Sequence, residues 1–577
     1  MITVDRNVEI AMRDGTVLYA DVYLPGPGRW PTLLQRTPYD KDVPAGTLVA
    51  LSPMTAVIGG FAVVVQDVRG RGRSAGEHVP FHEGPDGHDT IGWIVAQPWS
   101  DGKVGMFGSS YHGATQLQAA VDTPPGLRAI CPIQASSDYF EGRTYFGGAL
   151  ELGAILTTSL GVSGAVSLNR GGRDAAVKRR LRAGIGELME DLPAVATDLP
   201  LRDRLGRQDG PLRQLTPWFF DWVERTDPTD PYWTELAIEP RYGSIDLAAL
   251  HVTSWFDQFH VGTLRNYEGL RAGAASAAAR ENQYLIVGPW NHYPARTGGL
   301  GTSKVGDLTF GLGAQVHLDG IQLGWFGKAL RGDDPAFRQR KRVRIFVMGA
   351  DVWRDEDDWP LARQVSTPYY LDAAPMTLAP GPPAADAVAR YDYDPAHPAP
   401  THGGAHLVQG THVPQGPVDQ SAIDARADVV VFTSDELAED LEVTGWIEAE
   451  LWVRSSAPCT DFTVRLSDVH PDGRPFNVCD GISRIHIADP TQPARVPVRL
   501  GATAQLFRRG HRIRVAISSS NSPRFDLNPN TGGSAWDSAE VAVAEQQILT
   551  GPATPSRVVL PVIPLPSSVV DATEPAT

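Results

Sequence analysis

Two adjacent serines occupy the decapeptide MFGSSYHGAT at residues 106–115, where a short apolar run meets a segment of helical periodicity. This pattern predicts a strand, a sharp turn and a helix, and a turn of the G-x-S-x-G kind exposes a nucleophilic serine hydroxyl. Ser110 has Gly108 two residues before it, whereas Ser109 would have a bulky phenylalanine at that crowded position. The second glycine comes one residue late, at Gly113. Ser110 is the better candidate nucleophile, and a glycine-rich turn without chemistry is the alternative.

A serine hydroxyl is a weak nucleophile, so it needs an imidazole to take its proton and a carboxylate to orient that imidazole. Asp257 comes directly after the strand-like LHVTSWF, and His292 follows YLIVGPWN. The order serine, acid, histidine, with the last two on loops after later strands, is that of one large class of hydrolases. Asp67 also ends a strand-like run, but it precedes the serine. We interpret Asp67 as structural, as a cap or as a partner of a nearby arginine.

Acyl transfer also needs hydrogen-bond donors for the developing oxyanion. The backbone N–H of the residue after the nucleophile usually supplies one of them, and that residue is Tyr111. The loop after an early strand often supplies the second, and here it reads RTPYDK, without a glycine-rich HGGG-like stretch. The phenol of Tyr39 in this loop is a donor at neutral pH, because its ordinary pKa is near 10. A packing aromatic is the alternative interpretation of Tyr39.

The elements that must position these residues follow an α/β rhythm. Strand-like and helical runs alternate over 1–144 and again over 241–350, which predicts a mostly parallel sheet split in sequence. Between them, 145–240 has helical periodicity and is predicted to be an inserted helical cap. Short alternating strands over 351–577 predict an antiparallel sandwich or jelly roll. The predicted fold class is therefore α/β, with a core domain split in sequence, an inserted helical cap and a C-terminal β domain.

Composition excludes several classes of partner. The formal net charge is -16, which opposes binding to nucleic acid or to an anionic membrane surface. No run of 18 apolar residues or basic leader is seen, so we expect a soluble, cytoplasmic protein. The three cysteines show no metal-ligand spacing and are predicted to be buried thiols. The segment HEGPDGHD at 82–89 is interpreted as a turn into a helix rather than a metal site. We expect no cofactor and no metal.

Several stretches, in one order along nearly the whole chain, resemble the X-prolyl dipeptidyl peptidase-like serine hydrolases: RTPYDK, VVVQDVRGRGRSAGE, PWSDGKVGMFGSSYHGATQ, WFDQF, VGPWNH, FVMGADVWRDEDDWPL and SSSNSPRFDLNPNTGG. This family includes bacterial cocaine esterases, α-amino acid ester hydrolases and glutaryl cephalosporin acylases. The resemblance implies an α/β-hydrolase core, a cap, a jelly roll and an elbow whose second glycine comes late. It also implies that Ser110, Asp257 and His292 form the triad, with Tyr39 and Tyr111 as oxyanion donors.

The resemblance also bears on the substrate. Tyr145 and Thr158 stand where cocaine esterases carry two cap tryptophans, and Phe146 and Phe259 are further predicted pocket residues. The expected function is hydrolysis of small carboxylic esters through an acyl-enzyme. The alternatives are dipeptidyl-peptidase or amino acid ester activity and, from another class, a carbohydrate-binding protein on an inactive scaffold. Glu141 or Glu151 could hold a substrate ammonium, although solvated cap residues are the simpler interpretation. A small-molecule substrate is the expected partner, and a homodimer is left open.

Overall fold

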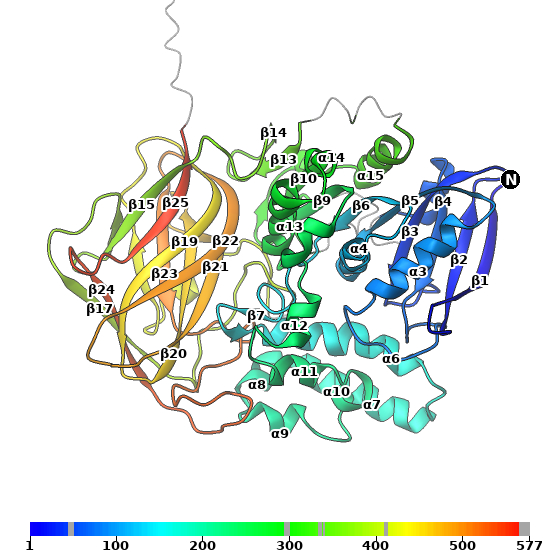
Figure 1. Cartoon of the computed structure of the whole chain (residues 1–577). Coiled ribbons are helices and arrows are strands. Elements are labelled where there is room, and N and C mark those ends of the chain that lie inside the picture. The colour runs from blue at the N-terminus through cyan, green and yellow to red at the C-terminus, as the bar shows by residue number, and fades with distance from the viewer. Residues whose placement is uncertain (44–50, 293–300, 333–336, 338–340, 409–412, 565–577) are drawn as a thin grey trace, which may run out of the picture.

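The computed structural model of the chain describes residues 1–43, 51–292, 301–332, 337, 341–408 and 413–564. Its first part is built on a ten-stranded sheet in the order β1-β2-β4-β3-β5-β6-β9-β10-β13-β14 (Figure 1). The strands from β4 to β13 run parallel, and antiparallel strands flank them at both edges. The strand bounds are β1 Thr3–Ala11, β2 Val17–Leu24, β3 Trp30–Thr37, β4 Ala62–Asp67, β5 Ser100–Ser109, β6 Leu127–Ile133, β9 Ala248–Phe256, β10 Gln283–Asn291, β13 Val343–Val347 and β14 Val352–Glu356.

Both faces of this sheet are covered, so its central strands are apolar on both sides. Alternate residues separate into two cores: Leu34 and Val64 pack with α3 and α4, whereas Leu33 and Val63 pack with α2 and α15. This period of two is the expected behaviour of a buried strand. The helices of the core are α2 Pro53–Ile58, α3 Gly84–Val95, α4 Tyr111–Val121, α13 His260–Gly273, α14 Ala277–Glu281 and α15 Leu318–Phe326.

A helical segment is inserted between β6 and β9 and lies along the bottom of Figure 1. It opens with a short hairpin, and its first long helical run contains π-helical turns over Thr157–Gly164. By length and composition the run Leu152–Asn169 could cross a membrane, but 56% of it is buried inside the protein, as in a core helix. The elements are β7 Tyr145–Phe146, β8 Ala149–Leu150, α5 Leu152–Leu156, η1 Thr157–Gly164, α6 Ala165–Asn169, α7 Ala175–Glu190, α8 Leu192–Thr197, α9 Leu201–Leu205, α10 Pro211–Leu215, α11 Phe219–Glu224, α12 Pro231–Leu236 and η2 Glu239–Ser244.

The C-terminal part is an eleven-stranded, almost wholly antiparallel β domain with its own apolar core. Its strands are β15 Val365–Asp372, β16 Thr377–Ala379, β17 Ala387–Tyr393, β18 Val430–Thr433, β19 Leu441–Ser455, β20 Cys459–Val469, β21 Pro475–His486, β22 Ala494–Phe507, β23 Arg512–Ser518, β24 Ala544–Thr550 and β25 Arg557–Ile563. Short elements elsewhere are β11 Lys304–Val305, β12 Leu308–Thr309, η4 Leu312–Ala314, η5 Gly327–Arg331 and α17 Ser421–Asp424. The predicted fold class is confirmed, and the three cysteines are buried and unpaired, as expected.

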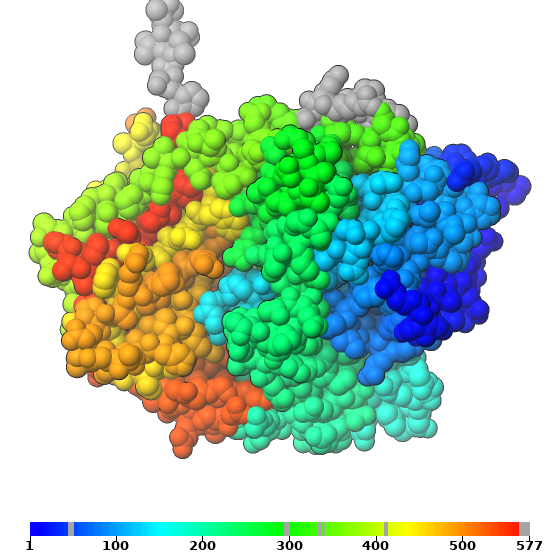
Figure 2. Space-filling view, viewed as in Figure 1, coloured from blue at the N-terminus to red at the C-terminus, as the bar shows by residue number. Residues whose placement is uncertain are grey.

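The hairpin β7–β8 joins the helical segment to the β domain. In Figure 2 its light-blue atoms fit between the orange strands and the green helices of the core. The amide of Arg484 donates to the carbonyl of Gly147 at 2.8 Å, and the amide of Leu150 donates to the Asp526 carboxylate at 2.8 Å. The β domain therefore holds the base of the cap in place.

Candidate active site

Three parallel strands bring the candidate nucleophile, acid and base to one edge of the sheet. Ser110 follows β5, Asp257 follows β9 and His292 follows β10. Because the carboxyl ends of parallel strands meet at the same edge, residues far apart in sequence become neighbours there. Ser110 and His292 line one cavity of about 370 Å³ between this edge and the cap. Oδ1 of the buried Asp257 lies 2.7 Å from Nδ1 of His292.

The turn that carries Ser110 is strained and needs glycine on both sides. Ser110 has φ +62° and ψ −123°, a left-handed conformation that side-chain-bearing residues rarely adopt. A Cβ on Gly108 would lie 2.4 Å from Cβ of His112, and one on Gly113 would lie 2.8 Å from Cβ of Ala135. Gly113 therefore allows α4 to cross closely over the segment after β6. The glycine comes late because the close crossing occurs one residue later than in the common pattern.

The contact between Asp257 and His292 fixes the tautomer of the imidazole. A carboxylate only accepts hydrogen bonds, so Nδ1 of His292 carries the proton and Nε2 is left as the basic atom. The ring of Phe259 meets the imidazole edge-on, with ring centroids 5.3 Å apart. This arrangement suits an imidazole that accepts a proton at Nε2 while Asp257 compensates the charge that results.

Both predicted oxyanion tyrosines line the cavity, but their side chains have different surroundings. Tyr39 packs edge-on against His112, with ring centroids 5.1 Å apart. The Tyr111 hydroxyl donates to the carboxyl of Glu83 and accepts from the amide of Phe81 at 2.9 Å. The phenol of Tyr111 is therefore engaged in hydrogen bonds behind the nucleophile turn, and its backbone N–H, at the first turn of α4, is the group available for an oxyanion.

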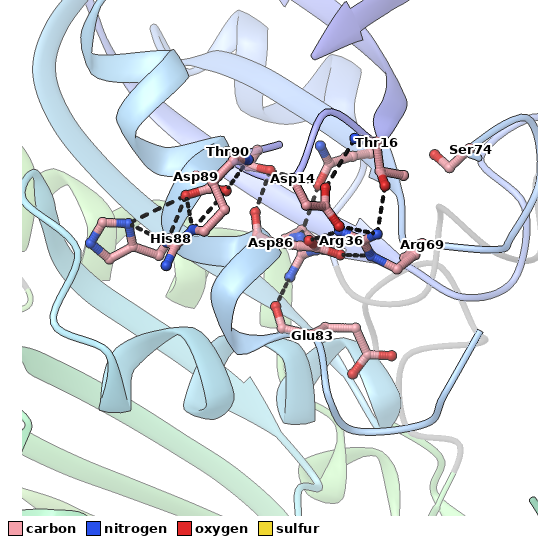
Figure 3. Close-up of polar contacts among 12 residues, drawn as sticks. Asp14, Thr16, Arg36, Arg69, Ser74, Glu83, Asp86, His88, Asp89 and Thr90 are labelled. Atoms are coloured by element: carbon pink, nitrogen blue, oxygen red, sulfur yellow. Dashed lines mark hydrogen bonds and ion pairs between the residues drawn. The ribbon is translucent and has the colours of Figure 1, made fainter. Parts of the chain in front are cut away.

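Glu83 is a site residue that sequence reasoning missed, because it lies in the segment interpreted only as a turn. The segment does turn into α3, as predicted, but Glu83 makes no side-chain cap. Instead, its carbonyl accepts from Arg36 at 2.6 Å, and Asp86 one turn later is held by Arg69 at 2.7 Å (Figure 3). These contacts fix the start of α3, so that the Glu83 carboxyl meets Tyr111 directly behind the nucleophile turn.

Burial raises the pKa of Glu83 to about 7, against the opposing effects of the Tyr111 hydroxyl and the Arg36 cation. One of its carboxyl oxygens has no hydrogen-bond partner among the described residues. Between pH 4.5 and 7 the folded protein keeps a proton that the unfolded chain releases, so Glu83 makes stability fall as pH rises. We expect Glu83→Gln to remove this dependence, which amounts to up to about 3 kcal/mol at pH 8.

Thermal unfolding of both proteins at pH 5 and pH 8 measures this effect. The midpoint of Glu83→Gln should fall less than that of the wild type between the two values. The other buried carboxyls whose pKa is raised to about 7, Asp67 and Glu151, are common to both proteins and cancel in the difference. Glu187→Gln, at a side chain that is 75% exposed, is the matched control and should follow the wild type. Parallel curves for all three proteins would contradict the role assigned to Glu83.

Comparison with known proteins agrees with this geometry. The sequence matches the X-Pro dipeptidyl-peptidase (S15 family) domain over residues 14–294 and the X-Pro dipeptidyl-peptidase C-terminal non-catalytic domain over residues 335–559. It is 37% identical over 592 residues to cocaine esterase of Rhodococcus sp. (strain MB1 Bresler), covering 97% of this chain and 99% of that one. The chain belongs to the X-Pro dipeptidyl-peptidase family. This family consists of serine hydrolases, and the chain is therefore a hydrolase of this type.

Two solved structures are similar to this chain over nearly its whole length. An α-amino acid ester hydrolase is 25% identical, with a TM-score of 0.78 over 97% of this chain and 96% of that one. An aminopeptidase from a marine sediment Thaumarchaeota archaeon is 24% identical, with a TM-score of 0.80 over 98% and 97%. The similarity to the aminopeptidase shows a shared fold, which comprises the α/β core, the cap and the β domain.

The cavity walls differ in part from those predicted for this family member. Thr158, on the π-helical run, and Phe259 line the cavity. Tyr145 and Phe146 are absent from its described lining. The ring of Tyr145 stacks on that of Phe140, with ring centroids 4.5 Å apart, whereas Phe146 packs edge-on against Phe525 of the β domain. The Tyr145 hydroxyl donates at 3.0 Å to the carbonyl of Trp222, and Trp222 itself lines the cavity. Phe146 lies against a neighbouring cavity of about 640 Å³ beside the β domain.

The two cap glutamates also lie outside the described cavity lining. Glu151 is buried rather than solvated, and its carboxylate pairs with Arg524 at 2.9 Å. Glu141 accepts from the amide of Gly147 at 3.3 Å. Asp67 pairs with no arginine side chain in the described structure; its carboxylate accepts from the backbone amides of Lys41 and Arg73. No Asp or Glu lines the cavity among the described residues.

Three residues of the β domain, Asp468, His470 and His511, lie close enough to hold a metal ion. Hydrogen bonds account for the position of the carboxylate, since Asp468 accepts from His511 at 2.8 Å and from Gln505 at 3.1 Å. This cluster lies in the C-terminal domain and lines a separate cavity. The segment 82–89 forms no such cluster within the described part of the chain.

Proposed function

We propose that this hydrolase cleaves small carboxylic esters through a covalent acyl-enzyme. The observation that carries the proposal is the pair formed by Asp257 and His292, 2.7 Å apart, beside a cavity that Ser110 and His292 both line. A nucleophile in a strained turn, a base of fixed tautomer and a buried acid are the groups that acyl transfer requires. The ester activity named for the Rhodococcus relative supports the same reaction.

In the proposed reaction, Oγ of Ser110 attacks the ester carbonyl while Nε2 of His292 takes the hydroxyl proton. The phenol of Tyr39 and the backbone N–H of Tyr111 donate hydrogen bonds to the oxyanion. His292 then returns the proton to the departing alkoxide, which leaves as an alcohol. A water molecule deprotonated by His292 attacks the acyl-enzyme, and the acid product leaves with Ser110 restored.

The lining of the cavity favours esters without a free amine over amino acid esters and peptides. Recognition of an α-ammonium group needs a carboxylate within reach, because a buried unpaired charge is costly. Of the two glutamates considered for this role, Glu151 is paired with Arg524 and Glu141 faces the hairpin. The one permanently charged side chain in the described lining is a cation, Arg143.

A substrate panel tests the proposal. We expect p-nitrophenyl acetate and butyrate to be hydrolysed with an initial burst of p-nitrophenol, which is the signature of an accumulating acyl-enzyme. Glycyl-prolyl p-nitroanilide and amino acid methyl esters should be poorer substrates by at least tenfold in kcat/KM. A fluorophosphonate probe should label the protein on Ser110, as peptide mapping would show.

Clear preference for substrates with a free α-amine would favour the dipeptidyl-peptidase or amino acid ester alternative. Absence of both ester turnover and fluorophosphonate labelling would favour a non-catalytic binding protein. Labelling of Ser109 in place of Ser110 would move the nucleophile by one residue and contradict the assignment.

A further inference from the structure

Arg143 is a buried cation at the cavity that contains Ser110. It lies just before the hairpin β7–β8, it is 7% exposed, and it lines the cavity. Its guanidinium packs over the ring of Trp222, 4.0 Å from the ring centroid, and over that of Phe81, at 4.8 Å. Two aromatic faces therefore hold the planar group in one orientation, which removes much of the entropy cost of fixing an arginine on binding.

The described structure gives this cation no carboxylate partner. Among the described residues, the Arg143 side chain donates one hydrogen bond, from Nη1 to the hydroxyl of Thr144 at 3.0 Å. The undescribed segments next in sequence to lining residues, 44–50, 293–300 and 409–412, contain no Asp or Glu. Burial lowers the pKa of Arg143 to about 10, so the group still carries its charge at neutral pH.

Other arginines with little solvent exposure are, in the described structure, either paired with carboxylates or absent from the described lining of this cavity. In the β domain, Arg524 pairs with Glu151 and Asp480, and Arg484 pairs with Asp461 and Asp526. Arg36 and Arg71 have no carboxylate partner among the described residues, but they donate to carbonyl, amide and hydroxyl oxygens, and neither is in the described lining. Arg143 therefore combines an uncompensated charge with access to the cavity.

We propose that Arg143 binds a carboxylate carried by the ester substrate, away from the bond that is cleaved. This inference rests on the proposed ester hydrolysis and adds the substrate class. A fixed guanidinium presents a fork of N–H donors that suits the planar carboxylate. A phosphate dianion would require more than one cation, and the described lining supplies a single one. A substrate ammonium would be repelled by the same charge.

The carboxylate can belong to the acyl part or to the alcohol part of the ester. Two pairs of substrates distinguish these two positions. The first pair is monoethyl glutarate and its neutral isostere ethyl 4-carbamoylbutanoate. The second pair is 4-acetoxybutanoate and 4-acetoxybutanamide. For wild-type enzyme we expect kcat/KM to favour the carboxylate in one pair by roughly 10- to 100-fold, as for a charge-assisted hydrogen bond in a desolvated site.

Substitution of Arg143 assigns this preference to its side chain. In Arg143→Gln the carboxylate-to-amide ratio should fall to within about threefold of one. Arg143→Lys, which keeps the charge without the fork, should give an intermediate ratio. Arg213→Gln is the matched control, because Arg213 also stacks on an aromatic ring, Phe220, but is not among the described lining residues. The control should keep the wild-type ratio.

A wild-type ratio near one in both pairs overturns the inference, while a burst with neutral esters would leave the proposed ester hydrolysis standing. An undiminished ratio in Arg143→Gln also overturns it. If Arg143→Gln fails to fold, the Lys variant and the wild-type ratio still decide the outcome. Absence of turnover with all four esters, together with absence of fluorophosphonate labelling, is instead the failure of the proposed function.

Discussion

Ser110→Ala should lower kcat for p-nitrophenyl esters by roughly 10⁵- to 10⁶-fold and abolish the burst of p-nitrophenol. The methyl group cannot form the ester bond of the acyl-enzyme, and His292 then has no hydroxyl to deprotonate. Residual hydrolysis would come from water in a cavity that still polarises the carbonyl. Rapid-mixing measurements of the first turnover, with protein concentration fixed by absorbance, would record both effects.

Ser109→Ala is the matched control for this prediction. Ser109 is buried at the end of β5, and its hydroxyl lies 3.4 Å from the side-chain oxygen of Gln134. It has none of the backbone strain that lifts Ser110 out of the sheet edge. We expect its loss to change kcat less than tenfold. A burst that survives in Ser110→Ala and disappears in Ser109→Ala would reverse the assignment of the two serines.

The periodicity of the sequence was enough to predict the fold class, because each class of element carries its own pattern. Val63, Val64 and Val65 in β4 are apolar without interruption, which is typical of a strand buried on both faces. The antiparallel strands β1, at the edge of the sheet, and β2, next to it, were not predicted, since both are partly exposed and their pattern is weaker. The inserted helices were predicted as a group, but their packing depends on contacts distant in sequence.

The same distinction applies to the site. Ser110, Asp257 and His292 could be proposed from chain order, because strand ends of a parallel sheet converge whatever the loops do. Residues of the cap follow no such rule. Tyr145 was proposed as a pocket wall, but its hydroxyl donates to the carbonyl of Trp222, which itself lines the cavity. The direction of a side chain on a two-residue strand cannot be predicted from sequence. Arg143 gave no signal at all, because the absence of a carboxylate partner in the described structure can be recognised only in three dimensions.

The lining of the cavity suggests how specificity is divided in this chain. In the proposed reaction the sheet edge supplies the reacting groups. Trp222 and Thr158 of the cavity wall come from the cap, and Arg143 lies just before the first strand of the cap hairpin. The cap is anchored to the β domain through buried ion pairs such as that between Glu151 and Arg524. Changes in the cap can therefore alter the acceptable substrate while the strand ends, and with them the chemistry, stay unchanged.

Asp257→Asn should lower kcat by about 10⁴-fold while leaving the fold intact. The amide can donate to Nδ1 of His292, and the imidazole would then carry its proton on Nε2, the atom that must accept from Ser110. The amide also carries no charge to compensate the imidazolium formed during attack. Because kcat depends on this charge and the substrate contacts are unchanged, KM should change far less than kcat.

Asp67→Asn is the informative comparison, since Asp67 is also buried at the end of a strand of the same sheet. Its carboxylate accepts from the amide of Lys41 at 2.7 Å and from that of Arg73 at 3.3 Å, so it supports the loop that carries Tyr39 rather than the imidazole. We expect Asp67→Asn to affect kcat at least 100-fold less than Asp257→Asn does. Equal losses in the two variants would mean that buried charge at the sheet edge, and not the tautomer of His292, controls the rate.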